Sequence, residues 1–182
     1  VSTDSFQYAD IALQYGASVP FLRPAQLACD NSSDTEFIEH ALTNYAKLGR
    51  KFDYVIHLRP TTPARDLTIL KEAYEMMVSY KYKYIRSAHE CSESPLKWFI
   101  EEAGYAQPLH SSVARMEDNN LPRQAFQTVY VPNGYIDIIN ARHFIEHNDL
   151  YLNNVKIFRT PFTQEIDNFD DMKITELRAT TI

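Results

Sequence analysis

The residues with the most obvious capacity to bind a ligand lie between positions 57 and 66, in the stretch HLRPTTPARD. The polar side chains of this central loop are Arg59, Thr61, Thr62 and Arg65. The preceding residues 52–58 form a short β-branched and aromatic run, which is typical of an interior strand in a parallel sheet. Ligands of such sheets bind beyond the carboxyl ends of the strands, so we expect substrate at this loop. The alternative is a proline-rich turn with solvated arginines.

A second candidate site is the acidic pair Glu165 and Asp167 near the C-terminus. Residues i and i+2 of an extended segment face the same side, so both carboxylates can converge on one cation. Oxygen donors of this kind suit Mg²⁺. The alternative is that Asp167 only caps the last predicted helix.

The elements that must position these groups alternate between the two kinds of secondary structure. Apolar periodicity predicts helices at about 4–15, 35–48, 66–79, 141–147 and 169–177. Strands are predicted at 52–58, 82–88, 129–131, 135–139 and 155–158, with a brief strand ending at Phe21. Strand, helix and strand in succession indicate crossover units, and hence a three-layer α/β/α domain with a mostly parallel sheet.

Between residues 90 and 128 this regular pattern stops. The segment is longer than most loops of a compact domain, and it carries Trp98, Phe99 and Phe126. We interpret it as an excursion that packs against a second subunit, within a single domain covering residues 1–182. The alternative is a disordered flap, which the aromatic residues disfavour.

Bulk composition limits the class of protein. The chain has 182 residues, 45% of them hydrophobic, which suits one globular domain with a substantial core. The formal net charge of -6 argues against nonspecific binding of nucleic acid. No stretch resembles a membrane span or a signal peptide, and Cys29 and Cys91 lack metal-ligand spacing, so we expect a cytoplasmic protein. The four glycines form no Gly-rich phosphate loop.

Seven short motifs, taken together, resemble those of one enzyme family. They occupy residues 1–5, 21–28, 58–65, 95–97, 123–124, 132–134 and 165–167. In this order and spacing they resemble the acylneuraminate cytidylyltransferases, which are the CMP-sialic acid synthetases. The resemblance implies a Rossmann-like nucleotidyltransferase that transfers CMP from CTP to a 2-keto sugar acid, such as sialic acid or a related nonulosonic acid, and releases pyrophosphate with Mg²⁺. Two alternatives stay open: a noncatalytic dimerising or sugar-acid-binding module, and a nucleotidyltransferase of the same fold with another sugar substrate.

The resemblance also assigns nucleotide and sugar contacts to individual residues. The nucleotide-binding residues would be Arg23, Ser32 and Ser33, and the substrate-binding residues would be Arg59, Thr61, Arg65, Lys97, Arg123 and Asn133. Arg59 stands where the family usually has glutamine, and its fixed positive charge favours a carboxylate or phosphate. Lys97 and Arg123 lie on the excursion and would reach the active site of the partner in a homodimer. Asn133 and Gly134 resemble the family's turn beside the sugar pocket.

The catalytic and metal-binding assignment falls on Glu165 and Asp167, which match the family's paired acidic residues. The family also has a first strand followed by Pro-Ala-Arg, Gly-Ser-Lys and Lys-Asn motifs around the triphosphate, and residues 1–182 do not contain them. Two expectations follow. Either these residues are a fragment of a longer enzyme, or the chain starts late and has lost activity, because the triphosphate would lack its main donors.

Overall fold

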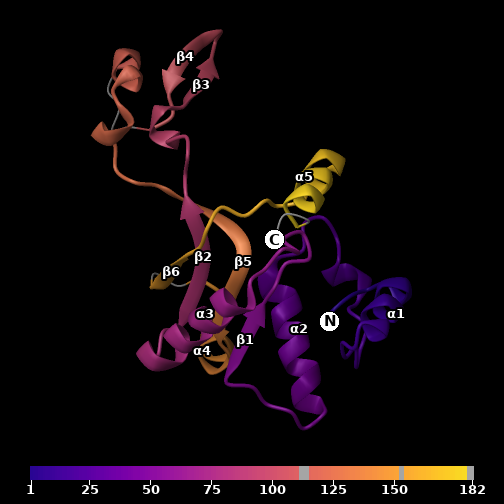
Figure 1. Ribbon diagram of the computed structural model, residues 1–182. Coiled ribbons are helices and arrows are strands. Elements are labelled where there is room, and N and C mark those ends of the chain that lie inside the picture. The colour runs from indigo at the N-terminus through magenta and orange to yellow at the C-terminus, as the bar shows by residue number, and fades with distance from the viewer. Residues whose placement is uncertain (111–114, 152–153, 180–182) are drawn as a thin grey trace. The chain divides into compact units, whose positions relative to one another are not determined.

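The computed structural model describes residues 1–110, 115–151 and 154–179 (Figure 1). The helices are α1 (Phe6–Gln14), α2 (Asp34–Lys47), α3 (Leu67–Tyr80), α4 (Ala141–His147) and α5 (Phe169–Ala179). The strands are β1 (Tyr54–His57), β2 (Tyr84–Glu90), β3 (Phe99–Glu102), β4 (Tyr105–Pro108), β5 (Tyr130–Asn140) and β6 (Val155–Arg159). Every helix predicted from the sequence is therefore present. No helix within these described residues is both long and apolar enough to span a bilayer.

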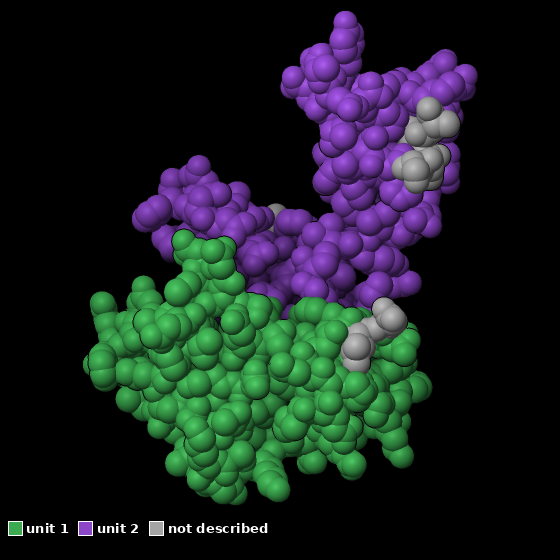
Figure 2. Space-filling model, turned by 180° about the vertical axis from the view of Figure 1, so that it is seen from behind, with its two compact units in different colours: residues 1–57, 74–85, 138–156 green, residues 58–73, 86–137, 157–182 purple. Residues whose placement is uncertain are grey.

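The chain divides into two compact units, coloured separately in Figure 2. Unit 1 consists of residues 1–57, 74–85 and 138–156, and unit 2 consists of residues 58–73, 86–137 and 157–182. Unit 1 contains the described hydrophobic cluster formed by Ile38, Tyr84, Ile139, Phe144 and Leu150. Unit 2 contains the central loop, the excursion and the acidic pair.

The main sheet has the strand order β1-β5-β2-β6. Strand β5 runs antiparallel to β2, because Cys91 N–H donates to the Val129 carbonyl and Asn140 N–H donates to the Lys83 carbonyl, both at 2.9 Å. The sheet is therefore mixed. The reversal has a simple cause: the described residues between β2 and β5 contain no crossover α-helix, so the chain leaves β2 and re-enters the sheet from the same end. Strand β1, predicted to be interior, stands at one end of this order, and Ile56 is 45% exposed.

In unit 1 the helix starts follow the capping residues of the sequence. Ser5 Oγ accepts from Tyr8 N–H at the start of α1. Ser33 and Glu36 form a capping box at the start of α2, and these hydrogen bonds from Ser33 lower the pKa of Glu36. The predicted apolar stripe of α1 is largely unburied: Phe6 is 77% exposed and Leu13 is 53% exposed, whereas Ala9 is buried. Helical periodicity identified the helix correctly but did not show what covers it.

Two further expectations for local structure were wrong. Residues 17–21 form no strand; Phe21 instead packs edge-on against His40 and Tyr45, with ring centroids 5.4 Å and 5.3 Å apart. The excursion, in which no period was recognised, contains the hairpin β3–β4, paired from Phe99 with Pro108 to Glu102 with Tyr105. Strands of four residues are too short to show a clear alternation.

Candidate active site

The central loop begins with a tight turn directly after strand β1. Thr62 N–H donates to the Arg59 carbonyl at 3.1 Å, which closes a four-residue turn with Pro60 in its second position. Proline favours this position because its ring fixes φ near the value that the turn requires. The Thr62 side chain is fully buried, and its hydroxyl donates to the Asn133 carbonyl at 3.3 Å. The turn therefore packs directly against strand β5.

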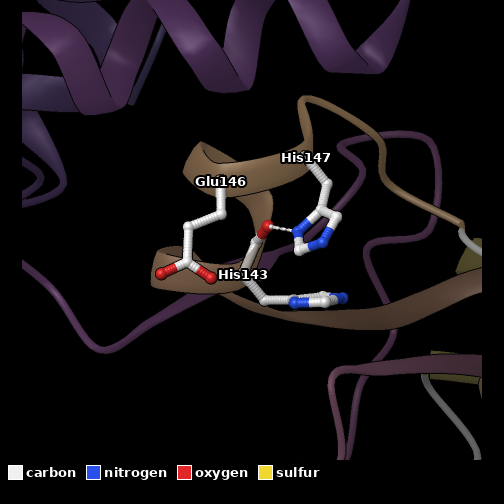
Figure 3. A group of neighbouring side chains, drawn as sticks. All are labelled: His143, Glu146 and His147. Atoms are coloured by element: carbon white, nitrogen blue, oxygen red, sulfur yellow. Dashed lines mark hydrogen bonds between the residues drawn. The ribbon is translucent and has the colours of Figure 1, made fainter.

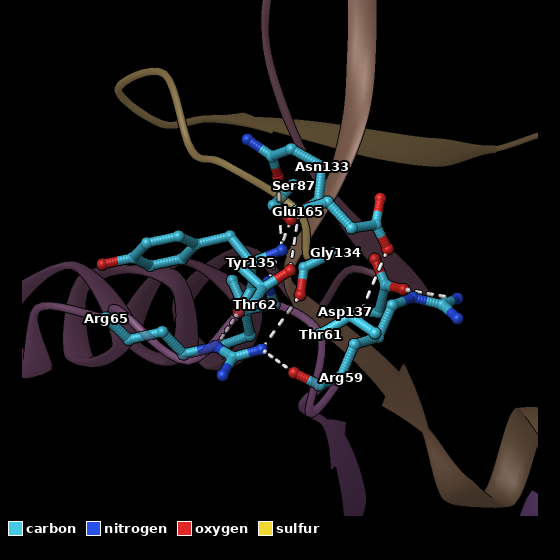
Figure 4. Close-up of polar contacts among 11 residues, drawn as sticks. Arg59, Thr61, Thr62, Arg65, Ser87, Asn133, Gly134, Tyr135, Asp137 and Glu165 are labelled. Atoms are coloured by element: carbon cyan, nitrogen blue, oxygen red, sulfur yellow. Dashed lines mark hydrogen bonds and ion pairs between the residues drawn. The ribbon is translucent and has the colours of Figure 1, made fainter. Parts of the chain in front are cut away.

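Arg65 holds the loop in place through backbone carbonyls (Figure 4). Its Nε donates to the Tyr135 carbonyl at 2.7 Å, and its terminal nitrogen donates to the carbonyls of Arg59 at 2.7 Å and Gly134 at 3.1 Å. Burial lowers the pKa of Arg65. The sequence assigned Arg65 to substrate; the structure shows a clamp between the loop and β5, which would position substrate-binding groups rather than replace them.

Gly134 permits the close approach of the loop to β5. Its φ is +61°, and a Cβ atom there would lie 2.8 Å from Arg59 Cδ and 3.2 Å from Thr62 Oγ1. The expectation that Asn133 and Gly134 form a turn between two strands was wrong, because both lie inside the continuous strand β5. A glycine within a strand often marks such a close backbone approach, and a positive φ is accessible to it without Cβ strain.

Asn133 is the centre of the hydrogen bonding in this part of unit 2. It is 3% exposed, and its Nδ2 donates to Thr160 Oγ1 at 2.7 Å and to His89 Nδ1 at 3.1 Å. Its Oδ1 accepts from Tyr135 N–H at 3.3 Å. Because an amide nitrogen only donates, His89 Nδ1 is the acceptor, and burial lowers the pKa of His89, which favours this neutral form. Asn133 thus ties β5 to β2 and to the segment after β6.

Arg59 lies near a buried carboxylate that the sequence analysis did not include. Its guanidinium is 3.7 Å from Asp137 Oδ2, and the two side chains are 27% and 3% exposed. Asp137 is a single charge inside an apolar strand, in the sequence Tyr-Ile-Asp-Ile-Ile, and that contrast is the signal that could have identified it. Much of the positive charge of Arg59 therefore compensates Asp137, so an acidic substrate would compete with this carboxylate.

The central loop and the acidic segment are brought together by tertiary structure. Thr61 Oγ1 donates to Glu165 Oε1 at 3.1 Å, and Ile166 N–H donates to the Thr61 carbonyl at 2.8 Å. The first of these contacts joins residues that are 104 positions apart in the sequence. Thr61 and Glu165, predicted separately from two motifs, are therefore neighbours (Figure 4).

Asp167 is not the helix cap that the alternative interpretation required. Asn168 Oδ1 accepts from the N–H groups of Asp170 at 2.9 Å and Asp171 at 3.1 Å, so Asn168 caps α5. The Asp167 side chain is exposed, and its carboxylate accepts no hydrogen bond within the part of the chain that the structure describes. This carboxylate and that of Glu165 are hard oxygen donors, so the residues present fit a Mg²⁺ ion that keeps most of its waters.

The two basic residues of the excursion make their polar contacts locally. Lys97 Nζ donates to the Leu121 carbonyl at 3.0 Å. Arg123 forms an exposed ion pair with Glu90 at 2.6 Å and donates to the Cys91 carbonyl at 3.0 Å. The predicted reach of these side chains into a partner's active site stays a prediction.

The three nucleotide-binding candidates lie in unit 1. Ser32 Oγ accepts from Cys29 N–H at 3.0 Å and donates to the Gln26 carbonyl at 3.3 Å, and Ser33 caps α2. Both hydroxyl groups therefore serve local structure. Arg23 differs: its guanidinium lies 5.2 Å from the centre of the Phe37 ring, and its buried Nε has no hydrogen-bond partner within the described residues. Of the three, Arg23 retains an unused donor.

Sequence comparison identifies relatives of this chain. It is 32% identical, over 83% of its length, to CMP-N,N'-diacetyllegionaminic acid synthase of Legionella pneumophila, and spans 63% of that protein. It is 32% identical over 80% of its length to N-acylneuraminate cytidylyltransferase of Escherichia coli, and spans 32% of that protein. Pseudaminic acid cytidylyltransferase of Campylobacter jejuni is 24% identical over 97% of this chain, which spans 75% of that relative. The resemblance to the acylneuraminate cytidylyltransferases is confirmed.

Structural comparison identifies the fold. A CMP:2-keto-3-deoxy-manno-octonic acid synthetase, solved in complex with CTP, superimposes with a TM-score of 0.68 and covers 100% of this chain and 80% of its own. Its sequence identity is 13%, so the match concerns the fold. The predicted Rossmann-like α/β nucleotidyltransferase fold is confirmed. No profile of a known protein family matches the chain.

Proposed function

We propose that this chain, a relative of the acylneuraminate cytidylyltransferases, takes part in the transfer of CMP from CTP to a 2-keto sugar acid with release of pyrophosphate. The observation that carries the proposal is the 32% identity to the Legionella synthase along 83% of the chain. The contact between Thr61 and Glu165 supports it, because two motifs of the resemblance meet there. The named sugars of the relatives differ, and the proposal is limited to acidic sugars as a class.

Glu165 and Asp167 are the residues that would hold Mg²⁺, because both offer carboxylate oxygens and that of Glu165 lies next to the central loop. A bound Mg²⁺ would neutralise phosphate charge and help to orient the α-phosphate for attack by the sugar hydroxyl. Thr61 has a positioning task, since its hydroxyl fixes one oxygen of Glu165 and leaves the other available. Arg65 and Asn133 hold the loop and strand β5 in register, so that the sugar meets a fixed set of groups.

We also propose that the excursion mediates a homodimer. Its exposed apolar side chains include Trp98 at 49%, Phe99 at 62% and Tyr105 at 73% exposure. Exposed aromatic side chains gathered on one segment are typical of an interaction surface. Light scattering at working concentration should give the mass of a dimer, and Phe99→Ser should shift the equilibrium towards monomer. A wild-type monomer would contradict this part of the proposal.

The test of the reaction uses the full-length protein with Mg²⁺, one of four nucleoside triphosphates and one of several 2-keto sugar acids. Pyrophosphate should appear only when both substrates are present, and CTP should be used in preference to ATP, GTP and UTP. Equal turnover with UTP would contradict the proposed preference for CTP, and with it a role of the loop containing Ser32 and Ser33 in recognising the base. Binding of the sugar acid without turnover under any of these conditions would instead favour the noncatalytic module.

A further inference from the structure

Helix α4 carries a group of potential metal ligands in unit 1, in the part of the chain outside the proposed active site. His143, Glu146 and His147 occupy positions i, i+3 and i+4 of the helix, which lie on one face. One ligand atom from each lies within 4.8 Å of those of the other two (Figure 3). No other set of three His, Cys, Asp or Glu side chains within the described residues is this close. The spacing, His-x-x-Glu-His, also occurs in zinc-binding helices.

The proton on the His147 ring can be located from its hydrogen bond. His147 Nδ1 lies 2.9 Å from the backbone carbonyl of His143, as Figure 3 shows. A carbonyl oxygen only accepts, so Nδ1 carries the proton and Nε2 presents a lone pair. Histidines that ligate metals commonly donate their other ring N–H in this way, since the bond fixes both tautomer and orientation.

The contacts around the group also hold its side chains close together. His143 is half-buried, and the centroid of its ring lies 4.1 Å from that of the His147 ring. Arg142 Nε donates to Glu146 Oε1 at 2.9 Å. This contact uses one carboxylate oxygen of Glu146, and the second can serve as the ligand.

We propose that His143, Glu146 and His147 bind one Zn²⁺ ion. Zn²⁺ accepts imidazole and carboxylate ligands at about 2.0–2.2 Å in tetrahedral geometry, so adjacent donor atoms lie about 3.3 Å apart. Donor atoms now within 4.8 Å can reach that spacing by small side-chain rotations, and water completes the fourth position. The ion would link both turns of α4, whose Phe144 is 1% exposed in the core of unit 1. A bound ion would therefore stabilise the helical conformation of α4. It does not depend on the proposed transferase activity.

The test is a calorimetric titration of the metal-free full-length protein with Zn²⁺, without nucleotide or sugar. His147→Ala removes an exposed ligand, and should weaken Zn²⁺ binding by at least about tenfold. Glu146→Gln should give a smaller loss, of about threefold. His110→Ala, at an exposed histidine in unit 2, is the matched control and should bind as the wild type does. At one fixed Zn²⁺ concentration that saturates the wild type, the melting temperature of the wild type and the control should rise by more than that of His147→Ala.

Replacing Zn²⁺ with Co²⁺ gives an independent, spectroscopic test of which residues bind the metal. The Co²⁺ complex should show visible d–d absorption without a thiolate charge-transfer band, which separates this site from Cys29 and Cys91. Excess Mg²⁺ should not compete, because it prefers oxygen ligands. The proposal is overturned if wild-type protein binds no Zn²⁺, or if His147→Ala binds it as tightly as His110→Ala does.

Discussion

The polar residues around Asn133 and the excursion at residues 90–128 use similar side chains in opposite ways. Around Asn133, Arg65 donates to three backbone carbonyls, and the carboxylate of Asp137 is 3% exposed beside Arg59. On the excursion, Arg123 pairs with Glu90 while both side chains are more than half exposed, at 51% and 57%. The excursion also exposes large aromatic side chains, whereas the region around Asn133 exposes few.

This difference shows that burial decides whether a polar or ionic contact determines local structure. A buried polar group that loses its partner retains its full desolvation cost, so each bond around Asn133 helps to fix the conformation of the central loop. A solvated ion pair loses little when it is broken, because water and salt replace it. The loop is therefore fixed from within the chain. The exposed apolar residues of the excursion are available for the contact that the proposed homodimer would make.

Of the substitutions that test this difference between the two regions, Asp137→Ala should have the largest effect on stability. Removal of the buried carboxylate breaks its ion pair with Arg59 and opens a cavity in strand β5, which should lower the free energy of unfolding by about 3 kcal/mol. Urea unfolding monitored by circular dichroism measures the change. A loss below about 1 kcal/mol would show that the pair behaves like a surface contact.

The next effect concerns activity rather than stability. Asp167→Asn in the full-length protein should lower kcat by about 100-fold, equivalent to about 2.7 kcal/mol, through loss of a charged Mg²⁺ ligand. The melting temperature should be unchanged, because Asn168 provides the cap of α5. Glu165→Gln should be milder, since an amide oxygen can still accept from Thr61. Rates measured against Mg²⁺ concentration test both variants, and wild-type Mg²⁺ dependence of Asp167→Asn would disprove the metal assignment.

A smaller effect is expected from Gly134→Ala, which should destabilise the protein by about 2 kcal/mol through the positive φ and the contact with Arg59 Cδ. Gly49→Ala is the matched control: its φ is +74°, but a Cβ atom there would meet nothing within 4 Å. Only the backbone term of about 1 kcal/mol should remain for this control. If thermal unfolding shows that the two variants lose equal stability, the central loop accommodates the added Cβ atom at position 134 without an energetic cost.

The smallest effect should come from Glu90→Ala on the excursion. Both partners of this ion pair are solvated, so the free energy of unfolding should fall by less than about 1 kcal/mol. The residual effect should also shrink as salt is added. Unfolding curves at low and high ionic strength provide the measurement, and a loss comparable with that of Asp137→Ala would remove the distinction between the two regions.

The sequence was sufficient for the helices and for the type of fold. The structure shows Ser5, Ser33 and Asn140 capping helix starts, where their side chains satisfy free backbone N–H groups locally, so the start of each of these helices depends on neighbouring residues. Apolar periodicity identified α2 and α4 for a similar reason, since a helix repeats its buried face within one or two turns. The motifs also pointed to Thr61, Glu165 and Asp167 before any contact between them was known.

Long-range packing decided what those residues do. Burial made Asp137 a partner of Arg59, turned Arg65 into a backbone clamp and placed Asn133 inside a strand instead of a turn. None of these outcomes follows from neighbours in the sequence, because the partners are distant: Tyr135 is 70 residues from Arg65, and His89 is 44 residues from Asn133. Residue type and local spacing determined which groups were available. Tertiary structure decided which of these groups build the site and which stay available for a ligand, as the Asp167 carboxylate does. The reason is that only packing removes a polar group from water and pairs it with another part of the chain.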